Sequence, residues 1–208
     1  MTTYVTMRSR ISDELVNESL TTAQINAAIQ SAIAHYQRKR FYFNESRAET
    51  FSTVASQEFY GTADNANIPN LSLIDKLTMT ASGTRFKLTP RSWEWIDERS
   101  STTTAIGQPT DYCYYAQQIR LYSIPDAVYT VRISGLVRFA ALSADGDSNA
   151  WMTDGEALIR GRAKWDIGTN VIYSDEIAAK GSELEMSSLR ALEAENTRRL
   201  SSSVRPYL

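Results

Sequence analysis

Cysteine and histidine are almost absent from this sequence, and their scarcity limits the chemistry that the chain can perform. The 208 residues contain one cysteine, Cys113, so no internal disulfide can form, which fits a chain kept in a reducing compartment. The single histidine, His35, stands inside an expected helix with no motif around it. A Ser-His-Asp or Cys-His catalytic site lacks its partners, and a zinc site lacks its ligands. We therefore predict a protein with no catalytic residues and no cofactor.

Long apolar runs and an excess of charge are also missing. No stretch approaches the ~18 apolar residues that a membrane span needs, and the first residues lack the apolar region of a signal peptide. The formal net charge is −2, so nothing attracts the chain as a whole to nucleic acid or to an anionic membrane. We expect no membrane segment and no glycine-rich nucleotide-binding loop, because neither pattern is present.

Helical periodicity marks the first zone, residues 1–48. A short helix is predicted over Met7–Asn17. Thr21 then stands three residues before Gln24, the spacing of a capping box at a helix start. Isoleucines four residues apart follow it and predict a second helix that ends near Phe43-Asn44: Ile25, Ile29 and Ile33.

A basic patch lies at the end of this second helix. Arg38, Lys39 and Arg40 are consecutive, and aromatic residues follow them. Cations could contact nucleic acid or another protein, but the negative end of a helix dipole also favours them. The rest of the chain is not basic enough for a DNA footprint, which favours the structural interpretation.

Short β-branched and aromatic runs mark the middle zone, residues 49–140. Hairpins are predicted around Ser82-Gly83 and around residues 116–118, and residues 129–139 alternate as a strand. Residues 93–99 could form a short helix after Pro90. In it, carboxylates stand beside Trp93 and Trp95, as in some glycosidase clefts, although an amphipathic turn on the sheet explains them more simply. Connected hairpins indicate an antiparallel β domain.

The last zone, residues 141–200, returns to helical periodicity. Thr153 and Glu156 have capping-box spacing, and Asp175 is the expected cap of a final helix. The short connection at residues 174–175 predicts an antiparallel helical pair that packs with the N-terminal helices. Glycines inside these helices indicate either a close approach of another backbone or a kink: Gly161, Gly168 and Gly181. The predicted fold is α+β, a helical bundle from both ends of the chain with an inserted antiparallel β domain.

The start of this zone resembles a calcium loop. Asp145, Asp147 and Asn149 alternate, and Glu156 stands at the twelfth position of the pattern. Ala150 occupies the place where such a loop needs glycine. Asp, Ser and Asn also build ordinary turns and helix caps, so we predict turn and cap roles here.

The chain ends in a short segment, residues 201–208, without a helical pattern. Three serines form a polar spacer, and a tip that is rich in interface-type residues follows. Pro206 favours an extended form. We predict that this tip binds a partner protein: Val204, Arg205, Pro206, Tyr207 and Leu208.

The sequence as a whole resembles the head-to-tail connector (adaptor) proteins of short-tailed bacteriophages. The resemblance begins with ISDELVNESLTTAQINAAIQSAIAHYQRKRFYFNE and TFSTVASQEFY, continues through KLTPRSWEWID and GQPTDYCYYAQQIRLYSIPDAVYTVRISG, and ends with LSADGDSNAWMTDGEALIRGRAKW. Its specificity lies in the order of the pieces: a helical start, Pro-Thr-x-Tyr, Leu-Tyr-x-x-Pro, and Asn-x-Trp before the last helices.

The resemblance implies a structural virion protein without catalysis, made in the host cytoplasm and located at the head-tail junction. It implies a homo-oligomeric ring, commonly of twelve copies, that docks on the portal protein and meets a downstream tail or nozzle protein. DNA would pass through the channel non-specifically during genome ejection, and residues 204–208 would enter the portal. The alternative from the residues alone is a carbohydrate- or receptor-binding β module of a tail-associated protein, suggested by the Tyr-rich hairpins with Trp93 and Trp95.

Overall fold

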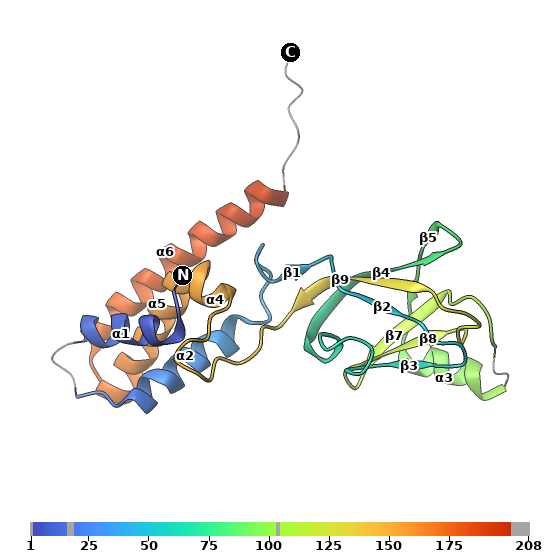
Figure 1. The fold of residues 1–208 in the computed structure, drawn as a ribbon. Helices are drawn as coiled ribbons and strands as arrows, with labels where there is room; N and C mark the ends of the chain where they lie inside the picture. The colour runs from blue at the N-terminus through green and yellow to red at the C-terminus, as the bar shows by residue number, and fades with distance from the viewer. Residues whose placement is uncertain (1, 16–18, 103–104, 201–208) are drawn as a thin grey trace, which may run out of the picture. The chain divides into compact units, whose positions relative to one another are not determined.

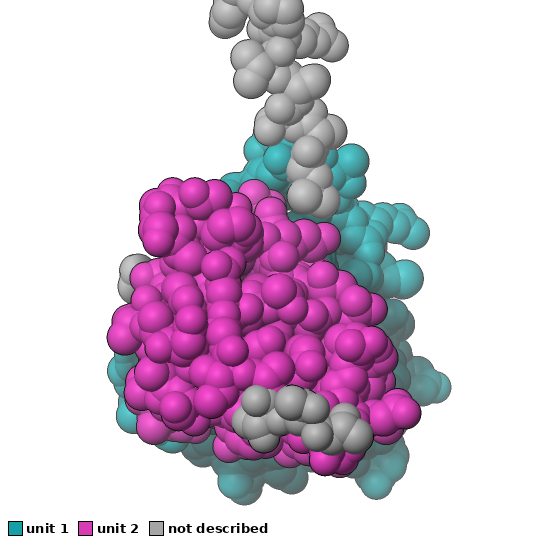
Figure 2. Space-filling view, turned by 90° about the vertical axis from the view of Figure 1, so that its right-hand side faces the viewer, with its two compact units in different colours: residues 1–44, 139–208 teal, residues 45–138 magenta. Residues whose placement is uncertain are grey.

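The computed structural model describes residues 2–15, 19–102 and 105–200. The chain divides into two compact units, which Figure 2 shows in different colours. Residues 1–44 and 139–208 form one, here called the helical unit, and residues 45–138 form the other, here called the β unit. Helices and largely antiparallel sheets occur together, so the predicted α+β class is confirmed.

The helical unit combines segments from both ends of the chain (Figure 1). Its core is formed by side chains with no more than 1% exposure, among them Met7, Ile29, Trp151 and Ile159. Its elements are α1 (Tyr4–Glu14), α2 (Thr22–Tyr36), α4 (Ala150–Thr153), α5 (Glu156–Ile167), the π-helical turn η2 (Gly168–Ile172) and α6 (Asp175–Leu200). The predicted capping box starts α2, because Thr21 and Gln24 exchange hydrogen bonds. Among the described residues, no helix is both long and apolar enough to cross a bilayer.

Close backbone contact between α5 and α6 explains the glycines inside them. A Cβ atom at Gly161 would lie 2.5 Å from the backbone nitrogen of Glu185, and one at Gly168 would lie 2.6 Å from that of Ala178. Gly181 meets the backbone of Trp165 in the same way from the opposite helix. The expected close approach is therefore present, and α5 runs past Gly161 to Ile167 before the π-helical turn begins at Gly168.

The β unit contains two sheets (Figure 1). The first has the order β1-β9-β4-β5, with β2 also paired to β9, and the second has the order β3-β8-β7-β6. All pairs are antiparallel except β6 with β7. The first sheet contains β1 (Glu45–Ser46), β2 (Thr50–Ser52), β4 (Leu71–Ala81), β5 (Thr84–Lys87) and β9 (Thr130–Val137). The second contains β3 (Phe59–Tyr60), β6 (Thr89–Pro90), β7 (Asp111–Tyr115) and β8 (Gln118–Tyr122); a 3-10 turn η1 (Ile68–Asn70) and the helix α3 (Trp93–Thr102) complete the unit.

Strand alternation places the β core as predicted. Val131 and Ile133 of β9 are buried, and Arg132 between them is exposed. Both predicted hairpins are present: β4 and β5 join at Ser82-Gly83, and β7 and β8 join at Ala116-Gln117, all at positive φ. These inward faces meet in one cluster that includes Leu77, Met79 and Leu121.

Three predicted details of the helices are wrong. The second helix ends at Tyr36 and not near residues 43–44, because Phe41 turns into the core against Trp151 and Asn44 bonds back to the amide of Phe41. The first helix spans Tyr4–Glu14 instead of Met7–Asn17, whose last residues, 16–18, lie outside the described part.

The third error concerns the caps of the C-terminal helices. Thr153 and Glu156 do not form a capping box: Thr153 donates to Asp154, and Gly155 precedes α5 without a side-chain cap. Asp175 is the first residue of α6, and the hydroxyl of Ser174 accepts the hydrogen bond from the amide of Ile177. Tertiary contacts hold Glu156, whose carboxylate pairs with Arg10 of α1.

Candidate interaction site

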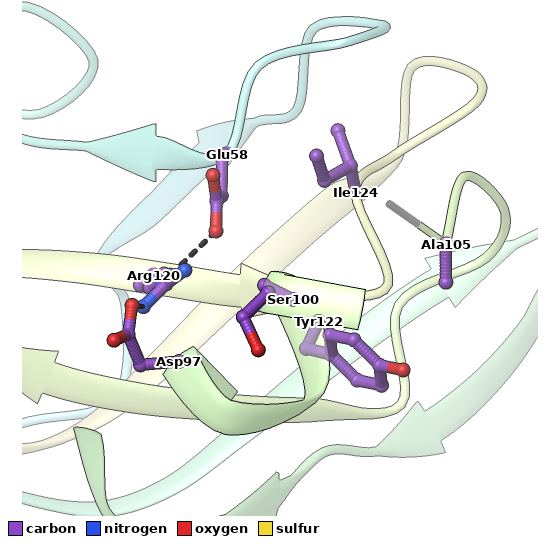
Figure 3. Close-up of a pocket in the computed structure, with 8 residues that line it drawn as sticks. Glu58, Asp97, Ser100, Ala105, Arg120, Tyr122 and Ile124 are labelled. Atoms are coloured by element: carbon purple, nitrogen blue, oxygen red, sulfur yellow. Dashed lines mark hydrogen bonds and ion pairs between the residues drawn. The ribbon is translucent and has the colours of Figure 1, made fainter. Parts of the chain in front are cut away.

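A buried arginine lies at the centre of the clearest polar cluster in the β unit. Arg120 points inward from β8, between Ile119 and Leu121, and its side chain is 6% exposed. Its Nε atom is 2.5 Å from Oε1 of Glu58, and a terminal nitrogen is 3.3 Å from Oδ1 of Asp97 on α3. Figure 3 shows the two carboxylates on either side of the guanidinium. A buried cation needs such partners, because burying it unpaired would cost several kcal/mol.

Aromatic rings cover the same arginine. Its guanidinium carbon is 4.6 Å from the ring centre of Trp93 and 5.3 Å from that of Phe59, at cation–π distances. Trp93 in turn lies 5.0 Å from the ring of Tyr115, and Phe59 and Tyr115 are 38% and 60% exposed. Trp93 thus extends an exposed row of three rings, which we call the aromatic row (Phe59, Trp93, Tyr115). Tryptophan, tyrosine and arginine are the residues most enriched in protein interfaces.

A pocket of about 260 Å³ opens beside this cluster. Carboxylates of Glu58 and Asp97 line it together with hydroxyl groups and two aliphatic side chains (Figure 3). With one arginine and two carboxylates, its formal charge is −1. Such a pocket offers acceptors to a basic side chain and apolar contacts to the stem of that side chain. It is lined by Glu58, Asp97, Ser100, Ser101, Ala105, Arg120, Tyr122 and Ile124.

The second tryptophan of α3 has a different environment. Trp95 lies between two guanidinium groups, with Arg91 at 4.5 Å and Arg99 at 4.4 Å from its ring centre. Arg91 also pairs with Asp111 at 2.7 Å. The two tryptophans that the sequence placed together therefore lie in separate cation–π clusters, and only Trp93 belongs to the aromatic row.

The residues of the calcium-like loop hydrogen-bond to protein groups. Asp147 accepts from the amides of Ala144 and Ser143, and these bonds lower the pKa of its carboxyl group. Asn149 accepts from the amide of Trp151 and caps α4. Asp145 pairs with Arg8 at 2.8 Å, so turn, cap and ion-pair roles account for the three side chains. In the described ranges, no three His, Cys, Asp or Glu side chains gather as metal ligands would.

Replacing Asn149 with alanine should lower the free energy of unfolding by about 1 kcal/mol, because the cap of α4 is lost. The measurement is urea unfolding followed by circular dichroism. Asp145→Ala is the control, since it removes only an exposed ion pair and should cost less than about 0.5 kcal/mol. A stoichiometric calcium-binding heat that disappears in Asp145→Ala would show that the loop is a calcium site after all.

The basic patch joins the end of α2 to α6. Lys39 pairs with Glu193 at 2.5 Å, and the backbone oxygen of Arg40 accepts from Asn196. Arg38 is exposed. Next to the patch, burial and a hydrogen bond to Asp154 raise the pKa of Tyr42 to about 12. One cation of this patch thus ties α2 to α6, and whether Arg38 contacts nucleic acid or a protein stays a prediction.

A buried acid lies between α2 and α5. Glu185 of α6 accepts from the hydroxyl of Tyr36 and lies 3.5 Å from Arg162. Burial, strengthened by this hydrogen bond, raises the pKa of Tyr36. The network fixes the three helices against one another. The predicted binding tip, residues 204–208, lies outside the described residues.

A comparison with known protein families matches residues 2–206 to the SU10 adaptor protein family. The match covers nearly the whole chain. The chain belongs to this family. The predicted resemblance to phage head-to-tail adaptors is therefore confirmed, and the protein is a structural adaptor of a bacteriophage virion.

Membership places this adaptor at the head-tail junction, among the portal and tail proteins. A search among curated proteins found no match. The sequence did not point to the Arg120 cluster, because Glu58, Asp97 and Arg120 are far apart in the chain. One signal was present: Arg120 breaks an apolar pattern in a strand, between Ile119 and Leu121.

Proposed function

We propose that this adaptor acts as a closed ring of identical copies, twelve as the resemblance implies, that docks on the portal, joins it to the tail or nozzle protein and leaves a channel for DNA. The family match over residues 2–206 carries the proposal. A non-enzymatic role agrees with the sequence, whose single histidine, His35, is exposed on α2 and has no catalytic partner motif. A formal net charge of −2 suits a conduit that lets DNA pass without holding it.

The portal contact is assigned to the C-terminal tip, residues 204–208. Valine, tyrosine and leucine at a chain end gain free energy only when a partner covers them, and tyrosine and arginine are frequent interface anchors. A tail of this composition suits insertion between subunits of the portal ring. The downstream tail or nozzle protein would then meet another surface of the adaptor.

Light scattering after size-exclusion chromatography tests the ring. The purified adaptor mixed with its portal should elute as one complex whose added mass is a whole multiple, near twelve, of the 23.3 kDa chain. A complex that holds one or a few copies would contradict the ring. A stable monomer that ignores the portal and binds glycans would instead support the carbohydrate-binding alternative.

A further inference from the structure

The strand β5 is an unpartnered edge of the first sheet. It is the last strand in the order β1-β9-β4-β5, and all four of its side chains are exposed. Two of them are basic, Arg85 and Lys87, and Phe86 between them is 40% exposed. Within the described part of the chain, neither basic side chain makes an ion pair. An exposed edge strand is a template for association, so a part of the assembly that covers β5 would remove a liability.

The pocket beside Arg120 has the opposite charge. Glu58 and Asp97 outnumber its single arginine, and exposed Glu94 and Glu98 of α3 lie on the same helix as Asp97. The nearby cations Arg91 and Arg99 lie over Trp95. The pocket volume of about 260 Å³ suits one long side chain rather than a drug-sized ligand, for which pockets start near 300 Å³.

These two features lie at opposite ends of the β unit. Figure 1 shows β5 at one end and α3 at the other. They belong to different sheets, since β5 pairs with β4, whereas the pocket is built from β8 and α3. A contact between them therefore cannot form within one copy. Two complementary patches on different surfaces of one subunit give a head-to-tail contact, and repeated head-to-tail contacts close into a ring when the rotation permits.

We propose that β5 of one adaptor copy docks on the pocket of the next copy, with Arg85 entering between Glu58 and Asp97. Ile124 and Ala105 offer apolar contact to its aliphatic stem, and free carboxylate oxygens accept from its guanidinium. Phe86 and the aromatic row supply the apolar part of the same interface. The inference deepens the proposed ring, on which it rests, by naming the surfaces that join its copies.

Chemical cross-linking in the assembled particle tests the contact. Particles carrying Arg85→Cys together with Asp97→Cys, treated with a short bismaleimide, should yield a ladder of adaptor multimers. Either single variant should yield no ladder, and neither should the pair Lys76→Cys with Asp97→Cys, because Lys76 is an exposed lysine on β4 outside β5. The native Cys113 is buried and is present in every variant.

A charge exchange gives an independent readout. Arg85→Asp should raise the concentration needed for ring assembly on the portal by roughly thirtyfold, and the double variant Arg85→Asp with Asp97→Arg should recover most of that loss. Lys76→Glu should leave assembly unchanged. Circular dichroism checks that each variant is folded.

The outcomes separate this inference from the ring itself. An intact ring without a ladder, and without recovery in the double variant, would overturn the contact and leave the ring standing. Cross-links from Arg85→Cys to the portal or to a tail protein would show that another chain covers β5. If no ring forms around the portal even with the unaltered adaptor, the proposed function fails first.

Discussion

Deleting residues 204–208 should weaken docking of the adaptor on its portal about thirtyfold. Anchor residues of an interface usually contribute 2 kcal/mol or more, and that free energy corresponds to a factor of about thirty in affinity. Tyr207 and Leu208 supply the apolar area, and Arg205 supplies a charge-assisted hydrogen bond. Pro206 limits the chain to extended forms and so reduces the entropy lost on binding.

The fold should survive this deletion. The buried core of the helical unit lies before the tip, among residues such as Ile29, Trp151 and Ile167. Portal affinity measured by biolayer interferometry, and unfolding measured in parallel, give the two readouts. Tyr207→Ala should reproduce a large part of the loss, and Ser202→Ala is the matched control that should bind normally.

Two results would contradict the assignment of the tip. A truncated adaptor that docks as tightly as the full chain would move the portal contact onto the helices. A truncated adaptor that loses several degrees of thermal stability would show that the tip packs on its own subunit, as chain ends sometimes do.

The secondary structure was predictable wherever one local rule acted alone. The capping box at Thr21 and the isoleucine spacing of α2 depend on neighbouring residues only, so the sequence located the start of that helix correctly. Hairpin turns are equally local, and the β4–β5 turn falls at Ser82-Gly83 as expected. The family resemblance added the adaptor role, which no single motif carries.

Contacts between distant residues were not predictable in this way. The early end of α2 depends on Phe41 packing against Trp151, and the two lie far apart in the chain. The carboxylate of Glu156 fits a capping box on paper, but its pairing with Arg10 of α1 decides its position. The Arg120 cluster draws its members from β8, α3 and the start of β3, so its parts met only after folding.

The interior glycines are the case in which the sequence left two readings open and the structure decides. A glycine inside a helix normally destabilises it by about 1 kcal/mol relative to alanine, so Gly→Ala usually stabilises. At Gly161 the sign should reverse, because a Cβ atom would lie 2.5 Å from the nitrogen and 2.9 Å from the Cα of Glu185. Real Cβ atoms do not approach a backbone that closely, so α5 and α6 would have to separate.

Gly161→Ala should therefore lower the free energy of unfolding by about 2 to 3 kcal/mol, in the upper range for an overpacked core. Separation of the two helices would also disturb Glu185, which bonds to Tyr36 and Arg162, so the loss should extend to α2. Gly146→Ala is the matched control, since nothing lies within 4 Å of its added Cβ and its stability should change little or rise slightly. Urea unfolding monitored by circular dichroism measures both variants. If Gly161→Ala is as stable as the unaltered chain, α5 and α6 have room to move apart, and the glycines are not what holds them close.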